Sequence, residues 1–261
     1  MPEGDTLFRA AETLRTWLVG RTITRVDARD VALKHRGADL VGKEVTAVEA
    51  RAKHLLITAG DWSVHSHMKM TGSWHVYATG ERWRKASAAM RLVIEAGDRT
   101  AVCFNAPVVQ IVPTGIVDQL PGVRTLGPDV LKDFNPDAGA QRLENIDQSM
   151  PIGDVLLDQT VVSGLGNIWR LEALWAERVH PATPVAALTH EQKRALVATG
   201  ARLMGAAAKT TRPRPEVYKR TGQPCRRCGA GIVAARMGKD HRTSYFCPIC
   251  QVPEQGPQAE S

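Results

Sequence analysis

The sequence has no segment suited to crossing a membrane or directing secretion. No apolar run in its 261 residues approaches the roughly 18 residues that a membrane-spanning helix needs. The N-terminus lacks a basic region followed by an apolar stretch, so we expect no signal peptide. We also find no internal repeat. The chain is long enough for two domains and a small module.

Cysteine is scarce, and its spacing is regular. Only five cysteines are present, and four of them form C-x2-C pairs, Cys225 with Cys228 and Cys247 with Cys250. The fifth, Cys103, lies in an apolar run and is expected to be a small buried hydrophobic residue. This usage is typical of metal binding in a reducing compartment rather than of a disulfide framework.

The two pairs are separated by eighteen residues, a spacing typical of a four-cysteine zinc ribbon. Each pair allows two thiolates to face one tetrahedral ion. Because all four positions are cysteine, no coordination position stays open, and we predict one structural Zn²⁺. Iron in the same sulfur cage and a redox pair are the alternatives, although two symmetric pairs argue against redox chemistry.

Acidic residues are in deficit. Lys and Arg number 34 against 27 Asp and Glu, which gives a net charge of +7. This excess suits a polyanionic partner such as nucleic acid, and it would also suit an anionic membrane surface. No Asp, Glu and His cluster fits an open catalytic metal site. Several cations lie between or beside the ribbon cysteines, where they could contact phosphates: Arg226, Arg227, Arg236, Lys239, His241 and Arg242.

The first half of the chain is predicted to be one helix followed by a β-rich domain. Residues 6–19 place leucines and alanines at helical spacing. Gly60-Asp61 and Gly97-Asp98 are turn signals between segments that are short, β-branched and partly alternating. These segments are 22–28, 44–59, 62–70, 73–78, 90–96 and 100–113. Antiparallel strands at this spacing favour a β-sandwich or barrel-like domain.

Helical patterns dominate the second half and are clearest at 166–179 and 190–208. Thr189 is a plausible N-cap for the second helix, and Gln192 stands at the position of its capping-box partner. Residues 210–216 are Pro-rich and basic, which is typical of a linker, and 253–261 form a polar tail. We predict an α+β multidomain chain with domains at 1–120, 121–209 and 217–253.

The chain begins Met1-Pro2-Glu3. Met1 precedes a small residue, so we expect its removal, which would leave Pro2 with a free secondary amine beside the Glu3 carboxylate. An α-amine titrates near pH ~8, so much of it is neutral and nucleophilic at cellular pH. Its attack on a sugar carbon gives an iminium, which is an electron sink. Many unrelated chains begin in the same way, so this motif carries weight only with others.

A second motif places Gly164, Gly166 and Asn167 at the start of a predicted helix. Such a turn is expected to expose backbone N–H groups at the positive end of the helix dipole. The two glycines would let a phosphate approach the backbone, and Asn167 could both cap the helix and donate to a phosphate. An ordinary corner between two helices is the alternative.

Together these features resemble the bifunctional DNA glycosylase/AP lyases of the formamidopyrimidine-DNA glycosylase and endonuclease VIII family. Four segments carry the match over essentially the whole chain: Pro2-Glu3-Gly4, Arg51-Ala52-Lys53-His54-Leu55-Leu56, Ser163 to Ile168, and Val217 to Gln251. The resemblance implies an N-terminal β-sandwich, a helical domain with a helix-two-turn-helix, and a C-terminal zinc finger. It also implies damaged DNA as partner, bound between the two domains, and a monomer. We expect a cytoplasmic location, nucleoid-associated if the protein is bacterial.

The resemblance also implies catalytic roles. Pro2 resembles the family's nucleophile, which attacks C1′ of the damaged nucleotide. Glu3 resembles the acid/base that assists opening of the sugar ring. Lys53, on its predicted strand, resembles the lysine that contacts phosphate beside the lesion, and Arg242 resembles the zinc-finger arginine that grips the lesion phosphates. Holding the flanking phosphates would position C1′ over the nucleophile.

Further residues are implied in DNA binding. Asn167 resembles the phosphate-binding asparagine of the helix-two-turn-helix, where Gly164 and Gly166 precede it. Met70 lies where relatives carry a residue that fills the space vacated by the flipped base, and an apolar wedge suits that task. A core methionine on a strand is the alternative for Met70.

Two features favour oxidised pyrimidines and abasic sites over oxidised purines. Relatives that remove oxidised purines carry Arg and Phe after an Asn-Asp-Pro, whereas this chain has Asn105-Ala106-Pro107-Val108-Val109-Gln110. Those relatives also carry a long loop before the zinc finger, where this chain has only the short segment 209–216. One departure stands out: many relatives have a Glu three residues after Glu3, and here Thr6 follows Asp5. Either Asp5 substitutes for that Glu, or lesion handling differs.

Three other functions remain as alternatives. The chain could be a catalytically inactive DNA-binding paralogue of the same fold, although phosphate binding alone would not need Glu3. It could be an oxidised-purine glycosylase. It could also be a zinc-ribbon protein that binds RNA or ribosomes, which would give its first three residues no role.

Overall fold

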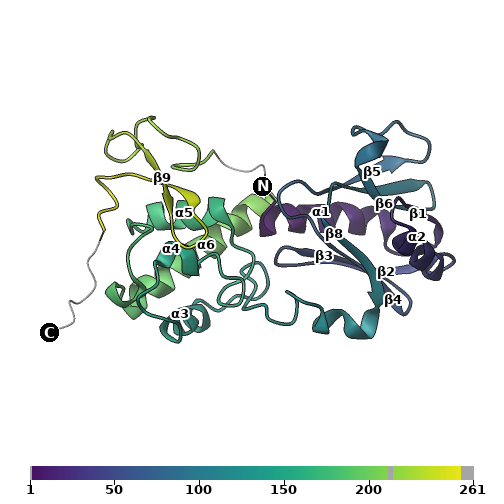
Figure 1. Ribbon diagram of the computed structural model, residues 1–261, viewed down its shortest axis with the longest axis horizontal. Coiled ribbons are helices and arrows are strands. Elements are labelled where there is room, and N and C mark those ends of the chain that lie inside the picture. Colours follow the sequence, from purple (N-terminus) through teal and green to yellow (C-terminus); the bar gives the residue numbers. More distant parts are fainter. Residues whose placement is uncertain (1, 211–213, 254–261) are drawn as a thin grey trace. The chain divides into compact units, whose positions relative to one another are not determined.

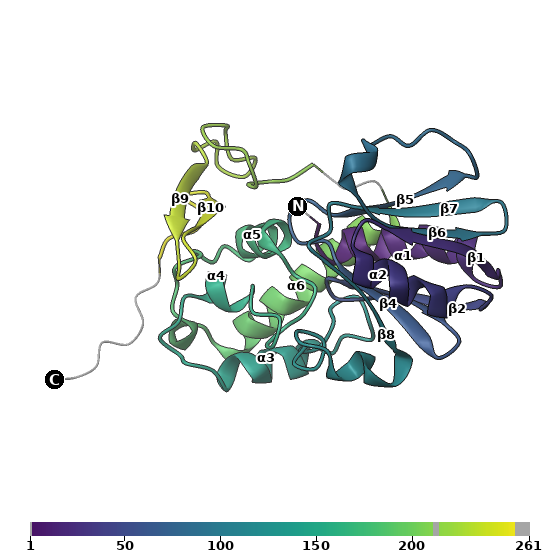
Figure 2. The ribbon, with the colours of Figure 1, turned by 45° about the vertical axis from the view of Figure 1, so that its right-hand side comes forward.

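The computed structural model describes residues 2–210 and 214–253 (Figure 1; Figure 2). The chain forms two compact units, Met1–Arg124 and Thr125–Ser261. Part of the predicted linker, 211–213, and most of the predicted tail, 254–261, lie outside the described residues. No helix of the described ranges is long and apolar enough to span a membrane.

The first unit is a sandwich of two antiparallel four-stranded sheets, as the sequence predicted. One sheet has the order β1-β6-β7-β5 and the other β2-β3-β4-β8. The strands are β1 (Ile23–Ala28), β2 (Val45–Arg51), β3 (His54–Ala59), β4 (Trp62–His67), β5 (Ser73–Ala78), β6 (Met90–Ala96), β7 (Arg99–Phe104) and β8 (Val108–Pro113). The tight turns at Gly60 and Gly97 have φ of +57° and +58°, a conformation that glycine adopts without a steric penalty.

Alternation of side chains explains the sandwich core. In β3, Leu55, Ile57 and Ala59 point into the core with Val64 of the neighbouring strand β4. A strand places successive side chains on opposite faces, so the residues between these, beginning with His54, lie on the other face of the sheet. That second face carries part of the candidate site described below.

Helix α1 (Gly4–Leu18) is buried with the sandwich core. Its residues Leu7, Ala11, Leu14 and Leu18 are all at most 1% exposed, and the helix contacts strands of both sheets. The predicted helix over 6–19 is therefore confirmed, and it begins two residues earlier, directly after Glu3. Core packing thus fixes the start of this helix.

One α-helix of this unit, α2 (Val31–Gly37), was not predicted from the sequence. Its N-cap is Asp30, whose carboxylate accepts a hydrogen bond from the Leu33 N–H at 2.8 Å. Short 3₁₀ helices complete the unit: η1 (Ala38–Leu40), η2 (Ser87–Ala89) and η3 (Thr114–Gln119). The chain after η3 returns along the outer face of β3, where a side chain at Gly122 would contact His54.

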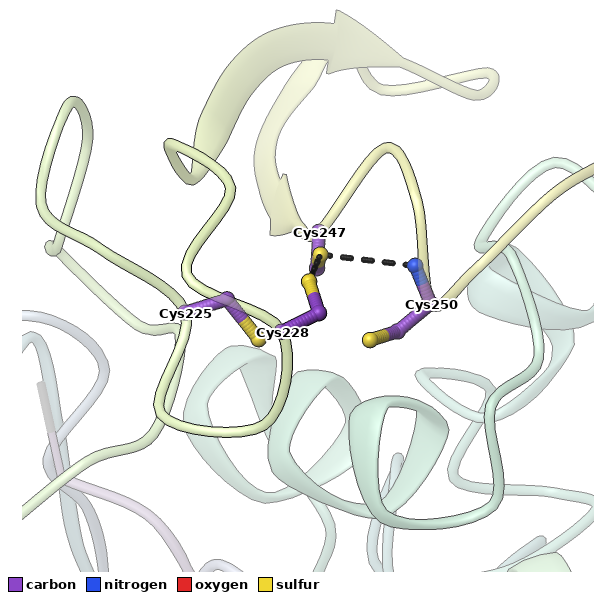
Figure 3. Close-up of side chains that lie close together, drawn as sticks. All are labelled: Cys225, Cys228, Cys247 and Cys250. Atoms are coloured by element: carbon purple, nitrogen blue, oxygen red, sulfur yellow. Dashed lines mark hydrogen bonds between the residues drawn. The ribbon is translucent and has the colours of Figure 1, made fainter.

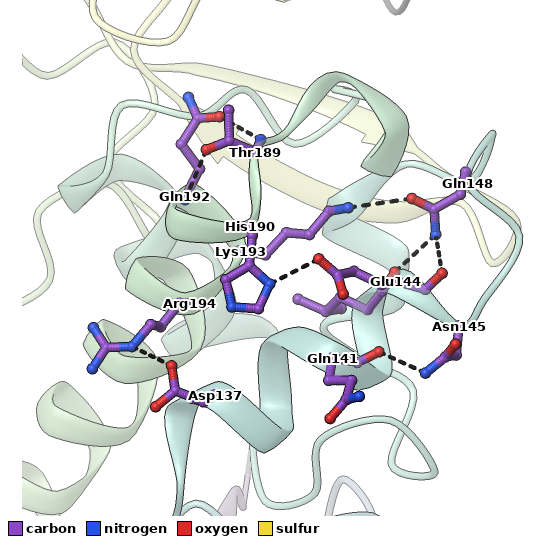
Figure 4. Close-up of polar contacts among 11 residues, drawn as sticks. Asp137, Gln141, Glu144, Asn145, Gln148, Thr189, His190, Gln192, Lys193 and Arg194 are labelled. Atoms are coloured by element: carbon purple, nitrogen blue, oxygen red, sulfur yellow. Dashed lines mark hydrogen bonds and ion pairs between the residues drawn. The ribbon is translucent and has the colours of Figure 1, made fainter.

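The second unit is helical and ends in a two-stranded hairpin. Its helices are α3 (Pro136–Glu144), α4 (Ile152–Val155), α5 (Asn167–Ala176), η4 (Val185–Ala187) and α6 (His190–Lys209). Thr189 caps α6, and its hydroxyl and the Gln192 side chain form the full capping box. Polar contacts join α6 to α3 on the surface, including His190 with Glu144 at 2.8 Å and Arg194 with Asp137 at 2.6 Å (Figure 4).

The hairpin consists of β9 (Val233–Met237) and β10 (Arg242–Phe246). Cys225, Cys247 and Ile232 belong to the same hydrophobic core as α5 and α6. The ribbon is thus packed on the helical domain through one continuous core.

Candidate active site and nucleic-acid interface

Pro2 and Glu3 stand at the start of α1. The Glu3 backbone carbonyl accepts hydrogen bonds from Thr6 N–H at 2.9 Å and Leu7 N–H at 3.1 Å, so Glu3 is the N-cap of the helix. Its side chain is fully buried, whereas Pro2 is partly exposed. A carboxylate at a helix N-terminus is stabilised by the helix dipole. The pair therefore combines a partly exposed proline with a fully buried carboxylate.

Asp5 is also fully buried, and its carboxylate pairs with the Arg9 guanidinium at 3.1 Å. A buried acid in an i,i+4 pair on the same helix is most simply structural. Relatives are expected to carry a Glu at the position of Thr6. Because the Asp5 carboxylate is already paired with Arg9, we interpret Asp5 as a structural residue that does not substitute for that Glu.

Lys53 does not lie on a strand, and that part of the sequence prediction is wrong. Ala52 and Lys53 form the turn between β2 and β3, and Ala52 has a left-handed φ of 53°. The apolar residues that follow Lys53, beginning with Leu55 and Leu56, make the segment resemble one continuous strand, and the turn is therefore not visible in the sequence. The turn places Lys53 at the end of the hairpin, where a cation can reach a ligand without unpairing a strand.

Met70 is 64% exposed and lies in the turn between β4 and β5, so the alternative of a core methionine on a strand is wrong. Met68 is the buried residue of that segment, at 1% exposure. The turn is tight: Gly72 N–H donates to the Met68 carbonyl at 2.8 Å, and a Cβ at Gly72 would overlap the Met68 backbone. A large apolar side chain held in solvent by a rigid turn suits insertion into a partner.

Asn167 is the first residue of α5, but it does not cap the helix. Gly166 is the N-cap and makes no side-chain capping bond, so the predicted capping role of Asn167 is wrong. The Asn167 amide instead donates from Nδ2 to the Thr243 carbonyl at 3.0 Å. Gly164 has φ of +99°, which favours glycine, and its N–H donates to Gln159 Oε1 at 3.0 Å rather than pointing to solvent.

Arg170 is the largest of the fully buried side chains, and it joins α5 to the ribbon. Its Nε donates to Asn167 Oδ1 at 2.9 Å and its Nη2 to Ser244 Oγ at 3.1 Å. Its Nη1 donates to the Gly153 carbonyl at 2.6 Å. These bonds fix the orientation of the Asn167 amide, because its oxygen must face the guanidinium.

The hairpin that carries Arg242 is held by the helices. Lys239 N–H donates to the Asp154 carboxylate at 2.9 Å, and the side chain of any residue other than glycine at 238 would overlap that carboxylate. Arg242 begins β10 and is about half exposed, with Asp240 at 3.7 Å. The structure thus presents Arg242 on an anchored strand beside Thr243, the partner of Asn167.

Two other ribbon cations are bound within the protein. Arg226 pairs with Glu216 at 2.9 Å. Arg227 stacks on the Trp175 ring at 4.2 Å and donates to the Trp175 carbonyl at 3.0 Å, at the C-terminus of α5. Nearby, Glu172 accepts three backbone N–H bonds from residues 216–218 at 2.7 to 3.1 Å, while burial raises the pKa of its carboxyl. These contacts are structural.

The four ribbon cysteines converge on one point (Figure 3). Their sulfur atoms lie within 4.8 Å of one another, and Cys228 Sγ is 3.4 Å from Cys247 Sγ. Backbone N–H groups of Arg227 and Cys250 donate to Cys225 Sγ and Cys247 Sγ at 3.5 and 3.4 Å. Four sulfurs with N–H donors around them fit a tetrahedral soft metal ion. This cluster could hold a metal ion.

Three histidines form a cluster that the sequence analysis did not identify. His54, His65 and His67 lie on the outer face of β3 and β4, below the turns that carry Lys53 and Met70. Burial is the main cause that lowers the pKa of His54 to about 3 and the pKa values of His65 and His67 to about 4. All three are therefore neutral at pH 7. The sequence signal for this cluster was the placement of His65 and His67 at alternate positions of one strand.

These shifts predict a pH-dependent stability. The pKa values in the folded protein lie below the ordinary value of 6.5, so the unfolded chain binds more protons between pH 6.5 and about 4. The contribution of these histidines to folding stability is then fully present above about pH 6.5, and it is lost as the pH falls toward 4 for His65 and His67 and toward 3 for His54. Urea unfolding of wild type and His65→Gln across this range measures it. The variant should show the shallower pH dependence, and parallel curves would contradict the assignment.

Comparison with known proteins gives the family. Residues 1–107 match the formamidopyrimidine-DNA glycosylase N-terminal domain, and residues 126–214 match the formamidopyrimidine-DNA glycosylase H2TH domain. The chain is 37% identical over 264 residues to a probable endonuclease 8 2 of Streptomyces coelicolor, covering 96% of this chain and 94% of that protein. It is 36% identical over 260 residues to the DNA-(apurinic or apyrimidinic site) lyase Nei2 of Mycolicibacterium smegmatis, covering 96% and 99%.

The fold agrees with a solved structure. Formamidopyrimidine DNA glycosylase of Lactococcus lactis, bound non-covalently to DNA containing an AP site, matches with a TM-score of 0.84 at 24% identity, covering 96% of this chain and all of that one. At this identity the likeness establishes the fold alone. The two domain matches and the extended sequence identity go further, and by them the chain belongs to the formamidopyrimidine-DNA glycosylase and endonuclease VIII family.

Proposed function

We propose that this protein is a base excision repair enzyme that removes oxidised bases from DNA and cleaves the strand as an AP lyase. Family membership over nearly the whole chain supports this function, as do relatives named as an endonuclease 8 and an AP lyase. The observation that carries the proposal is Pro2 beside a fully buried Glu3 at the start of α1. An amine nucleophile next to an acid is the requirement of such chemistry.

The reaction begins at the amine of Pro2, freed by removal of Met1. The amine bonds to C1′ as the C1′–base bond breaks, and the base leaves with the proton that the amine loses. Glu3 protonates the ring oxygen as the C1′–O4′ bond opens, which gives an iminium. The iminium acidifies C2′, and loss of a C2′ proton expels the 3′ phosphate. Water then adds to C1′ of the remaining unsaturated iminium, the C1′–N bond breaks, and the released aldehyde leaves Pro2 as a free amine.

Three side chains are proposed to hold the phosphates around the lesion. Lys53 offers a point charge from its hairpin turn, Arg242 a guanidinium from β10, and Asn167 an amide fixed by Arg170. The turn of Gly164 and Gly166 supports Asn167 from behind. Met70 is proposed to fill the space that the extruded nucleotide leaves, which its exposure supports.

We propose that the four-cysteine cluster holds one structural Zn²⁺. The converging sulfurs and their N–H donors support this assignment, and four thiolates leave no position for a substrate. The ion would fix the ribbon that presents Arg242. A monomer and a cytoplasmic location remain predictions, as do the domain bounds of 1–120, 121–209 and 217–253.

Oxidised pyrimidines are the proposed substrates, together with abasic sites. Val108 and Val109 begin β8 where purine-specific relatives are expected to carry Arg, and Gln110 is hydrogen-bonded to His65 at 2.8 Å. This stretch therefore offers no cation or aromatic ring for an oxidised purine and its partner strand. The endonuclease 8 relatives agree with this branch.

Substrate preference is tested on matched duplexes that carry one thymine glycol, one 8-oxoguanine or one abasic site. We expect single-turnover excision of thymine glycol to be at least about tenfold faster than that of 8-oxoguanine, since the loss of one or two base contacts changes rates by this order. Faster excision of 8-oxoguanine would support the oxidised-purine alternative. Duplex binding without any strand cleavage would support the inactive paralogue.

A further inference from the structure

The ribbon hairpin carries Arg242 at the end farthest from the cysteine cluster. Arg242 pairs with Met237 across the two strands, and only the turn 238–241 lies beyond this pair. Cys247 directly follows the last residue of β10. At about 3.4 Å per residue of extended strand, Arg242 and Cys247 are roughly 17 Å apart. A metal ion at the cysteines would therefore fix the base of the hairpin but not the turn next to Arg242.

Two contacts from α5 hold the middle of β10. Asn167 Nδ2 donates to the Thr243 carbonyl at 3.0 Å, and Arg170 Nη2 donates to Ser244 Oγ at 3.1 Å. Both contacts lie on the cysteine side of Arg242. A two-stranded hairpin is only marginally stable by itself. The turn on the other side of Arg242 therefore needs an anchor of its own.

Asp154 of α4 supplies that anchor. Its partly buried carboxylate accepts a hydrogen bond at Oδ2 from Lys239 N–H at 2.9 Å. Gly238 stands directly against the same carboxylate, since a Cβ at 238 would overlap it, and its φ of +75° favours glycine. His241 N–H donates to the Gly238 carbonyl at 3.2 Å and closes the turn directly before Arg242.

The residue before Asp154 connects α4 to the other proposed phosphate-binding group of this unit. The Gly153 carbonyl accepts from Arg170 Nη1 at 2.6 Å, and Arg170 Nε donates to Asn167 Oδ1 at 2.9 Å. Two consecutive residues of α4 thus lead to Asn167 and, through the hairpin turn, to Arg242. The apolar residues of α4 belong to the core of the second unit: Ile152 and Val155.

We infer that Asp154 is a positioning residue that holds the hairpin turn, so that Arg242 keeps a fixed distance from Asn167 for contact with DNA phosphates. The inference rests on the proposed function, because it takes Arg242 and Asn167 as phosphate-binding residues. A carboxylate and a phosphate are both anions and repel each other. Asp154 therefore acts through the backbone of the turn, and the fixed spacing lowers the entropy that phosphate binding costs.

The sign of one substitution separates positioning from a simple effect of charge. Asp154→Ala removes a negative charge together with the acceptor for Lys239 N–H, and the loss of charge alone would strengthen phosphate binding. We expect instead that affinity for a duplex with one tetrahydrofuran abasic site falls about tenfold, because the turn is released. Asp154→Asn keeps an acceptor of the same shape and should bind within about threefold of wild type. Unchanged or tighter binding by Asp154→Ala would overturn the inference.

Metal content and a double-mutant cycle exclude general damage to the ribbon. Asp154→Ala should keep about one zinc ion per chain, because the four cysteines are unchanged. In an Arg242→Ala background the group to be positioned is gone, so Asp154→Ala should change affinity by less than about twofold. An equal loss in both backgrounds, or loss of zinc from Asp154→Ala, would mean a merely structural role and would overturn the inference.

Gly238→Ala is an independent probe, because it leaves the carboxylate in place. Its methyl group would overlap the Asp154 carboxylate, and we expect the displaced turn to lower duplex affinity about tenfold. The backbone strain at 238 is the same in either background, whereas the overlap exists only with Asp154. The loss should therefore be at least about threefold smaller in an Asp154→Ala background, and equal losses would count against the inference. Should Asp154→Ala fail to fold, Gly238→Ala replaces it in the cycle with Arg242→Ala.

Affinity for the abasic-site analogue needs no catalysis. If wild type binds this duplex but forms no borohydride adduct on any lesion, the proposed enzymatic function fails while the affinity cycle still decides the role of Asp154. If Arg242→Ala binds the duplex like wild type, Arg242 has no phosphate-binding role, and the inference is overturned with it.

Discussion

Replacing Glu3 with glutamine should slow base excision by about 10²- to 10⁴-fold, the usual contribution of one general acid–base group. Glutamine keeps the size and shape of the fully buried side chain but cannot transfer a proton to the sugar ring. It also removes the negative charge that stabilises the positive charge developing on the sugar. Single-turnover release of the damaged base measures the effect, and the thermal unfolding midpoint shows that the fold is kept.

Asp5→Asn is the matched control, because Asp5 is an equally buried carboxylate in the same helical turn. Its ion pair with Arg9 indicates a structural role, so excision should fall by less than about tenfold, in line with the usual loss of a buried hydrogen-bonded group. A loss as large as that of Glu3→Gln would instead mean that Asp5 substitutes for the glutamate that relatives carry at the position of Thr6.

Removal of the metal from the ribbon should give the second large effect. Cys228→Ser deletes one ligand of the four-sulfur cluster, and a structural zinc site rarely survives such a loss. We expect zinc content to fall from about one ion per chain to nearly none. Duplex affinity should fall about 10- to 100-fold, because the charge-assisted contact of Arg242 with phosphate requires an ordered β10.

Cys103→Ala is the control for this experiment, since Cys103 is buried in the first unit and takes no part in the cluster. It should keep both its zinc and its duplex affinity. Metal analysis with fluorescence anisotropy on an abasic-site duplex measures both quantities. If Cys228→Ser loses zinc yet binds DNA like wild type, the ribbon does not contribute to binding of the DNA phosphates.

The sandwich and the ribbon could be predicted because their signals are local. Alternation over Leu55, Ile57 and Ala59 reports one buried face of a strand, and Gly60 and Gly97 mark turns by their conformational freedom. The two C-x2-C pairs likewise indicate a metal cluster from local spacing alone. Helix α2 was missed because seven residues give little periodicity, although Asp30 three residues before Leu33 was an available capping signal.

The parts that escaped prediction depend on contacts distant in sequence. His54, His65 and Gln110 come together only through the register of three strands, which no periodicity specifies. Asn167 was expected to cap its own helix, but Thr243 and Arg170 compete for its amide from the tertiary structure. Lys53 was placed on a strand because a two-residue turn within an apolar run has no strong turn residue.

The Pro2 amine is proposed to form a covalent intermediate with the sugar of a damaged nucleotide. Borohydride reduction during reaction with thymine glycol DNA, followed by proteolysis and mass spectrometry of the adduct, identifies the residue that carries the sugar. We expect a sugar-modified peptide that begins at Pro2 and carries the added mass on its amine. An adduct on a lysine such as Lys53, or no adduct while the lesion strand is cleaved, would contradict it.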